Sequence, residues 1–233
     1  MRVIDPQCKH NPWDDPFVKL RNQIIVTLML GPGPRRGETL SAKGNALQAA
    51  SRLLAIIRNQ DDKTDPRRKQ PLPKTKERLL LLGPDLLALL IQYMKERGKK
   101  PVARKHGFLF VSRSGKPLST SSITKMFADL RKACPGIGYV TAHVLRHTSN
   151  ELFSDHADAI SMDPVTEKRL RIEKYGWSPR TRMADYYLRR KTKHQAGEAS
   201  LAVQNQITRE ANDAKLRIQE ENELRRFLSG DML

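Results

Sequence analysis

Apolar positions recur along much of this chain with the period of α-helices, and proline- or glycine-rich breaks separate the runs. Asp15 followed by Pro16 is typical of a helix N-cap with a first-turn proline. The apolar pattern of "FVKLRNQIIVTLML" then predicts a helix that ends at the "GPGP" of 31–34. "PDLLALLIQYMKER" predicts an amphipathic helix that also starts at a proline.

Three further helices are predicted in the second half of the chain. "ITKMFADLRKAC" follows a cap near 119–122 and stops at Pro135-Gly136, and another helix begins after Thr141. A polar segment, "SDHADAISMDPVTEKR", separates that helix from "LRIEKYGW". Ser178 and Pro179 indicate the N-cap and first turn of the next helix, so Trp177 lies just before it.

Strand signals are short and few. "KTKERLLLLG" is basic at its start and apolar at its end, which suits the arm of a β-hairpin, and "HGFLFVSRSGKPLS" predicts a strand and a turn. "RRGETLSAKGNALQAASRLLAIIR" is helical or mixed, and "NQDDKTDPRRKQPLP" at 59–73 is a polar loop. Because repeated βαβ alternation is missing, we expect a mainly α fold with a small antiparallel β-sheet (α+β).

Three segments follow from this pattern. Residues 1–15 resemble a linker, 16–197 form the main domain, and 198–233 form a C-terminal amphipathic helix. The apolar stripe of that helix packs either on its own body or on a neighbouring molecule, and spacing alone leaves both open.

Charge is the main compositional signal. The 233 residues include 43 Lys and Arg against 25 Asp and Glu, a formal net charge of +18. Residues 201–233 carry five basic and six acidic side chains, so the excess lies in the rest of the chain. This balance indicates a polyanionic partner, most often nucleic acid, that contacts the main domain.

Cysteine content and hydropathy exclude other classes. Cys8 and Cys134 form no CxxC motif, so neither a disulfide framework nor a cysteine-based zinc site is expected. The chain shows no apolar run of membrane-spanning length and no signal peptide at its start. We therefore expect a cytoplasmic protein that works without a membrane.

The stretch "TAHVLRHTSNELF" at 141–153 offers two kinds of site. His143 and His147 have the spacing of two metal ligands on a helix, but a zincin needs Glu where Val144 stands, and no third ligand has a diagnostic spacing. Alternatively, Arg146 supplies a fork of donors to a phosphate with a histidine beside it. We expect the phosphate site and no metal or cofactor.

Other motifs line up with the phosphate interpretation. In chain order they are "PRRGETL" with Arg35, "PKTKER" with Lys74 and Lys76, the His143–His147 segment, and "GWSPRTRMADYY". This order resembles the tyrosine recombinases, or phage integrases, whose catalytic domains read R-x-[GS]-[DE]-L, a hairpin Lys, H-x-L-R-H, G-[HW] and a Tyr nine residues later. The resemblance covers about residues 17–190. The chain departs from the family pattern at two points. The residues before the first arginine are "GPGP", and after Glu38 the apolar residue of the pattern comes one position late, at Leu40.

The resemblance implies the tyrosine recombinase catalytic-domain fold and phosphoryl transfer on double-stranded DNA without a metal. Arg35 and Arg146 would stabilise the transition state, and a hairpin lysine would protonate the leaving oxygen. Lys74 is the expected acid and Lys76 the alternative. His143 would assist proton transfer or hold a phosphate oxygen.

The remaining roles are also implied by the resemblance. Trp177 would donate to the phosphate and pack beneath it, while Glu38 and His147 would support their neighbours. Tyr186, nine residues after Trp177, is the expected nucleophile, and Tyr187 points about 100° away on a helix. The expected contacts with the DNA backbone are Arg36, Arg67, Arg68, Lys76, Arg78, Arg180 and Arg182.

Family members assemble as tetramers on DNA, with the C-terminal helix docking onto the next protomer, and many serve mobile elements in bacterial cells. They also carry an N-terminal clamp domain, so we expect this chain to be a fragment of a longer recombinase. Two alternatives stay open: a type IB topoisomerase, which shares the chemistry, and a non-cleaving DNA-binding relative. The acidic-basic helical tail and the compact size favour a recombinase over the topoisomerase, and the complete motif set argues against the non-cleaving relative.

Overall fold

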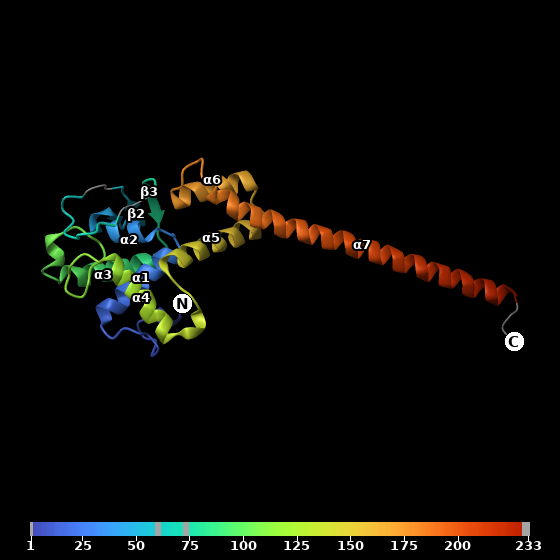
Figure 1. Ribbon diagram of the computed structural model, residues 1–233, viewed down its shortest axis with the longest axis horizontal. Coiled ribbons are helices and arrows are strands. Elements are labelled where there is room, and N and C mark those ends of the chain that lie inside the picture. Colours follow the sequence, from blue (N-terminus) through green and yellow to red (C-terminus); the bar gives the residue numbers. More distant parts are fainter. Residues whose placement is uncertain (1, 59–61, 72–74, 230–233) are drawn as a thin grey trace. The chain divides into compact units, whose positions relative to one another are not determined.

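A computed structural model describes residues 2–58, 62–71 and 75–229. Clustering of its internal contacts divides the chain into two compact units, Met1–Ala184 and Asp185–Leu233. Helix α7 (Met183–Ser229) makes up the described part of the second unit (Figure 1). The expected boundary at 197 therefore falls inside one continuous helix, and the division lies at 184 instead. Within the described ranges, no helix has the length and apolar character of a membrane span.

The first unit is mainly helical with one small antiparallel sheet, which confirms the predicted fold class. Its helices are α1 (Pro16–Leu30), α2 (Arg36–Ser41), α3 (Pro84–Gly98), α4 (Thr120–Ala133), α5 (Ala142–Ala159) and α6 (Pro164–Tyr175). Its strands are β1 (Leu47–Gln48), β2 (Leu53–Ile56) and β3 (Arg78–Leu81), paired in the order β1-β2-β3.

Helix starts follow the predicted caps in three cases. The Asp15 carboxylate accepts the backbone N–H groups of Phe17 (2.9 Å) and Val18 (3.1 Å) at the start of α1. Hydroxyl groups of Ser119 and Thr141 accept in the same way at α4 and α5, at 3.1 and 3.2 Å. The local sequence thus fixes where these helices begin.

Three helix boundaries differ from prediction, one of them the start of α6 at Pro164, inside the expected polar spacer at 154–169. Helix α7 begins at Met183 and not at Ser178, because Thr181 N–H donates to the Ser178 carbonyl (2.9 Å) in a separate turn. Helix α5 continues to Ala159 through residues expected to be a polar spacer. Polar residues on a solvent-facing helix side do not end a helix, so polarity alone was a poor stop signal.

Strands β1 and β2 arise from the segment that looked helical or mixed, and β3 arises from the segment expected to be a hairpin arm. β2 pairs with both neighbours, with Leu54 opposite Leu80 and Ile56 opposite Arg78 in β3. Alternation along the strands buries Leu54 and Leu80 and leaves Leu79 exposed. The strand expected at 106–118 is reduced to two isolated bridges, one of them Val111–Pro117.

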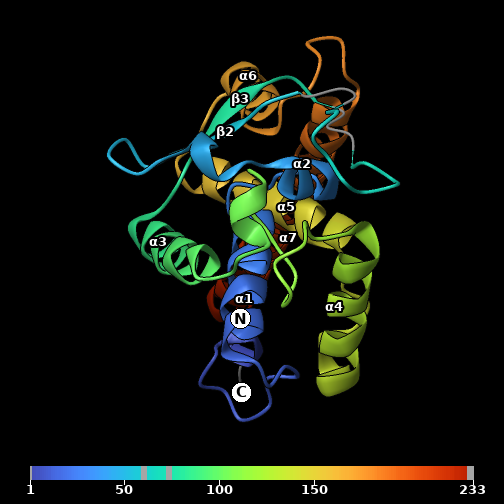
Figure 2. The same cartoon turned by 90° about the vertical axis from the view of Figure 1, so that its left-hand side faces the viewer.

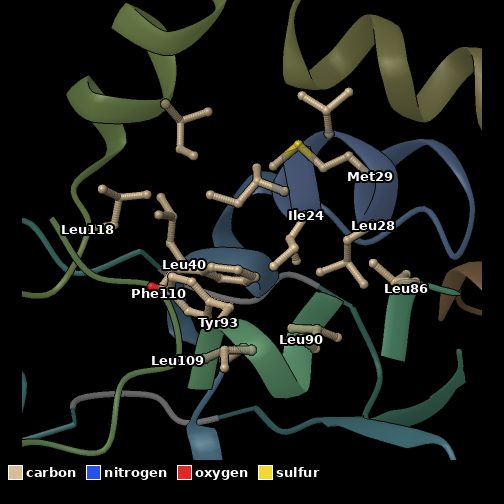
Figure 3. Close-up of a cluster of buried hydrophobic side chains, with 14 of the residues drawn as sticks. Ile24, Leu28, Met29, Leu40, Leu86, Leu90, Tyr93, Leu109, Phe110 and Leu118 are labelled. Carbon is tan, nitrogen blue, oxygen red and sulfur yellow. The ribbon is translucent and has the colours of Figure 1, made fainter. Parts of the chain in front are cut away.

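Helix α1 forms the centre of the core and packs against α3 and α5 (Figure 2). Its fully buried side chains meet Leu90 and Tyr93 of α3 and the segment at 109–110 (Figure 3). Ile4 and Trp13 also belong to this core, with 3% and 7% of their surface exposed. Residues 2–15 are therefore anchored to the domain by these two side chains, in contrast to the linker expected from their composition.

A matched pair of leucines tests this description of the core. Leu90 is fully buried, whereas Leu201 of α7 is 59% exposed. Leu90→Ala should lower the free energy of unfolding by about 2–5 kcal/mol, because it removes buried methyl groups and leaves a cavity. Leu201→Ala should leave it unchanged within error. Urea unfolding followed by tryptophan fluorescence measures both, and equal effects would contradict the packing of α3 against α1.

Candidate active site

The turn between α1 and α2 positions Arg35. Gly33 has φ of +74°, and a Cβ atom there would lie 2.7 Å from both Ser149 Oγ and Tyr175 Cε1. Only glycine fits this conformation and this close approach. Ser149 Oγ also donates to the Gly31 carbonyl (3.1 Å), so α5 holds the turn that carries Arg35 to the start of α2.

Glu38 links this turn to the β-hairpin. Its carboxylate accepts the backbone N–H of Arg35 (2.8 Å), the Thr75 hydroxyl, and Nη2 and Nη1 of Arg78 (2.8 and 3.3 Å). The Arg78 and Glu38 side chains are 2% and 0% exposed. Glu38 was expected to orient a neighbour by hydrogen bonding, and these contacts are of that kind.

The same hairpin reaches the end of α6. Arg78 Nε donates to the Lys174 carbonyl (3.0 Å), and the Lys76 N–H donates to the Gly176 carbonyl (3.0 Å). A Cβ on Gly176, where φ is +61°, would lie 2.7 Å from Arg78 Nη1. Arg78 is thus a buried internal tie and not the surface DNA contact expected from the sequence. Lys74, the expected acid, lies outside the described residues.

Arg146 projects from α5 into the same region and is only 7% exposed. Its Nη2 donates to the Tyr175 carbonyl (3.0 Å) and its Nη1 to the Gly33 carbonyl. Its guanidinium carbon lies 5.0 Å from the Tyr175 ring centre and 5.9 Å from that of Trp177. A guanidinium has five N–H donors, so these two bonds leave donors for a further acceptor.

Trp177 follows Gly176 and is buried, with 5% of its surface exposed. Its ring stacks on Tyr175, with centres 5.3 Å apart and planes inclined by 29°. Its expected position beneath a phosphate stays a prediction. Its hydrogen bond to a phosphate stays a prediction.

Positive charge exceeds negative charge in this cluster. Arg35, Arg78 and Arg146 lie near the carboxylate of Glu38, and Lys174 lies near Arg78 and Arg146. Burial, and then the nearby Arg35, lowers the pKa of Arg146 to about 10. Burial also lowers the pKa of Lys174, with Arg78 acting in the same direction. These shifts mean that the cations are crowded and partly desolvated, an environment that an anion would relieve.

Arg35 carries the clearest unused donor. Its Nη1 is buried and makes no hydrogen bond with the part of the chain that the structure describes. Burial lowers the pKa of Arg35, although Glu38 opposes this shift. A buried guanidinium nitrogen normally has an acceptor, so this atom is suited to meet a ligand oxygen.

His143 and His147 contact each other on α5, with their Nε2 atoms 2.9 Å apart. Burial lowers the pKa of His147, and the neighbouring His143 acts in the same direction. The guanidinium of Arg146 points instead to the carbonyls described above. The expected contact of His143 with a phosphate stays a prediction.

The expected DNA contacts divide into two groups. The exposed ones, which can meet a DNA backbone, are Arg36, Arg68, Lys76, Arg180 and Arg182. Arg67 differs, because it pairs with Asp65 at 2.7 Å and donates to the carbonyls of Leu40 (3.0 Å) and Leu118 (2.8 Å). With its side chain 8% exposed, Arg67 ties the polar loop to the body and is not a surface contact.

Tyr186 and Tyr187 lie in the first turn of α7 and belong to the second unit. Tyr186 is exposed, and its ring centre lies 5.3 Å from that of Tyr187. Which of the two acts as the nucleophile stays a prediction.

Comparison with known proteins identifies the family of this chain. The model of the phage integrase family matches residues 13–159. The chain belongs to this family. That match ends before Trp177 and Tyr186, whose assignment therefore rests on their spacing. A search of curated proteins found no match.

Solved structures with the same fold include recombinases and an integrase. The TM-score is 0.53 with XerA recombinase, at 23% identity, covering 83% of this chain and 61% of that one. The TM-score is 0.57 with XerH site-specific recombinase bound to difH substrate in a pre-cleavage complex, at 18% identity. That match covers 84% of this chain and 49% of the XerH chain. The TM-score is 0.51 with Tn1549 transposon integrase in complex with circular intermediate DNA, at 17% identity. That match covers 73% of this chain and 54% of the integrase chain. The chain thus spans about half to three fifths of these proteins.

Sequence reasoning missed several residues that organise this phage integrase domain. Lys174 Nζ donates to the Gly31 carbonyl (3.0 Å), and Tyr175 shares a hydrogen bond with Ser149 (3.0 Å). Lys174 and Tyr175 directly precede the Gly176-Trp177 motif, which was the only available signal. Thr75, next to the expected acid Lys74, gave no signal at all.

Two ion-paired carboxylates test the role of Glu38. Glu38→Gln leaves the Arg78 guanidinium buried without its counter-charge, so it should lower the free energy of unfolding by about 3–5 kcal/mol. Glu96 pairs with Lys99 at 2.6 Å on the surface, and Glu96→Gln should have little effect. Thermal unfolding of both variants checks this, and a Glu38→Gln protein as stable as the wild type would contradict the account.

Proposed function

We propose that this protein is a site-specific DNA recombinase or integrase that cleaves and rejoins DNA through a covalent 3′-phosphotyrosine. The observation that carries the proposal is the partly buried cationic cluster, in which Arg78 and Arg146 are buried. Arg35 and Arg146 keep N–H donors that the described chain does not use, and three arginines, Arg35, Arg78 and Arg146, lie near one carboxylate, that of Glu38. A phosphodiester supplies both the missing negative charge and the missing acceptors.

The proposed reaction is an exchange of one phosphate ester for another. The Tyr186 oxygen attacks phosphorus and loses its proton, while the bond to the 5′ oxygen breaks and that oxygen takes up a proton. Charge accumulates on the non-bridging oxygens of the five-coordinate transition state, where the guanidiniums of Arg35 and Arg146 stabilise it. Lys74 or Lys76 delivers the proton to the leaving oxygen, and His143 assists proton transfer.

The covalent intermediate explains how cleavage and rejoining are coupled. The phosphotyrosine ester conserves the energy of the broken link, so the freed 5′ hydroxyl of the same or another strand can reverse the step. Rejoining then needs no nucleotide cofactor.

The surface charge supports binding of double-stranded DNA by the first unit. The chain has a net charge of +18, and the exposed cations include Arg36, Arg68 and Arg180. Neutralisation of several phosphates releases counterions, so affinity should fall steeply as salt rises. We place the protein on chromosomal or mobile-element DNA in the bacterial cytoplasm.

We further propose that the protein works as a tetramer on DNA and that α7 docks onto a neighbouring protomer. Leu201, Ile207 and Ile218 of α7 are each more than half exposed. Apolar side chains at these spacings on a solvated helix favour a helix that packs on a partner.

A suicide DNA substrate tests the nucleophile. With a cognate site nicked next to the scissile bond, the wild type in EDTA should form an adduct that migrates slowly on a denaturing gel. Tyr186→Phe should abolish this adduct, because it removes only the attacking oxygen, and Tyr187→Phe should retain it. If only Tyr187→Phe loses the adduct, the nucleophile is Tyr187 and not Tyr186. Absence of any adduct would favour a DNA-binding protein without cleavage.

A pair of arginines tests the transition-state role of the cluster. Arg35→Lys keeps a positive charge but loses the planar fork, and should slow single-turnover cleavage about 10²–10³-fold. Arg36→Lys, at the exposed neighbour, should change the rate little. DNA affinity from gel shifts should be similar in both variants. Equal cleavage rates would show that Arg35 does not act on the reacting phosphate.

A further inference from the structure

The imidazoles of His143 and His147 lie close enough together to coordinate one metal ion. The two residues lie one turn apart near the start of α5, and their Nε2 atoms are 2.9 Å apart. Their rings are nearly perpendicular, inclined by 85°, with centres 4.4 Å apart.

The nitrogen–nitrogen distance matches that of neighbouring ligands on one metal. Metal–imidazole bonds are about 2.0–2.1 Å long, so two nitrogens at about a right angle around the metal lie about 2.9 Å apart. The observed separation has the same value, and in the metal-free chain the two atoms share a hydrogen bond at this distance. The metal would replace this hydrogen bond. The ring that donates it would carry its proton on Nδ1 instead, and small rotations about the side-chain bonds would then turn both Nε2 lone pairs to one point.

The surroundings allow access and set the metal preference. His143 is exposed, and Arg146 between the two histidines directs its guanidinium inward to Gly33 and Tyr175. Among the described residues, no group of three or more His, Cys, Asp or Glu side chains is arranged to hold a metal. Water would therefore complete the coordination. The nearby guanidiniums oppose a cation, so only metals that bind imidazole strongly are expected.

We propose that His143 and His147 form a two-histidine chelate for a divalent transition metal, with Cu²⁺ bound most tightly, and that the bound metal inhibits strand cleavage. Cu²⁺ binds nitrogen ligands more strongly than Ni²⁺ or Zn²⁺, whereas Mg²⁺ prefers oxygen. A metal on Nε2 of His143 occupies the atom that would otherwise exchange a proton or hydrogen bond at the phosphate. The inhibitory part rests on the proposed function, but binding does not.

Calorimetric titration of untagged, DNA-free protein tests the chelate. Cys8→Ser/Cys134→Ser protein is the background, because free thiols react with Cu²⁺. It should bind one Cu²⁺ ion tightly, Zn²⁺ more weakly, and Mg²⁺ not at all. His143→Asn and His147→Asn should each weaken Cu²⁺ binding about tenfold or more, since even residues that merely orient a metal ligand contribute that much.

His156→Asn is the matched control, because His156 is an exposed histidine on the same helix. It should leave Cu²⁺ binding unchanged. Absence of Cu²⁺ binding, or equal loss in His156→Asn, would overturn the chelate.

Cleavage of the suicide substrate tests inhibition. In the same background, Cu²⁺ should suppress adduct formation, and EDTA should restore it. His147→Asn should show little suppression relative to its own metal-free rate. Binding without suppression would overturn the inhibitory part. A protein that never forms the adduct in EDTA would refute the proposed function, while the titration would still decide the chelate.

Discussion

The carboxylate of Glu38 is the point on which the site depends. It is buried and accepts from the backbone of Arg35, from Thr75 and from Arg78, which come from two separate segments. Arg78 in turn bonds the end of α6. A single acid thus fixes the α1–α2 turn, the hairpin and the approach to Trp177. The buried Glu38–Arg78 pair adds little net stability, because desolvation of the two charges offsets much of their attraction. Its main contribution is to fix the positions of the segments that it joins.

The rest of the site follows from the charge that this arrangement leaves uncompensated. Arg35 and Arg146 are brought next to Arg78 and Lys174 although like charges repel, and burial strengthens that repulsion. Packing of the glycine turn against Ser149 and the carbonyl contacts of Arg146 keep the cations in place. A protein domain that holds cations together in this way is prepared for an anion, and DNA offers one at every phosphate.

The sequence was informative where function or local chemistry constrains residue type. The caps at Asp15, Ser119 and Thr141 placed three helices correctly, because a side-chain acceptor at the N-terminus is a local requirement. The order of the arginine, lysine and histidine motifs identified the family. Each motif is short, but their sequence order is set by the fold.

What the sequence did not reveal depends on tertiary partners. Arg67 and Arg78 resembled surface cations, since burial of an arginine is visible only when its acceptors at Asp65 and Glu38 are placed beside it. Lys174 belongs to no sequence motif that would have marked it as part of the site. Polarity at 154–159 did not end α5. Ser178 did not start α7, because residues 178–181 form a separate turn with its own hydrogen bond.

The most direct test of the central claim, phosphoryl transfer to a tyrosine at this cationic site, is mass spectrometry of the trapped adduct. Trypsin should release Met183–Arg189, a peptide that contains both candidate tyrosines. After nuclease digestion of the DNA, the account predicts a nucleotide linked through phosphate to Tyr186 in this peptide. A nucleotide on any other peptide, or an adduct formed equally well when Arg35 and Arg146 are both replaced, would contradict it.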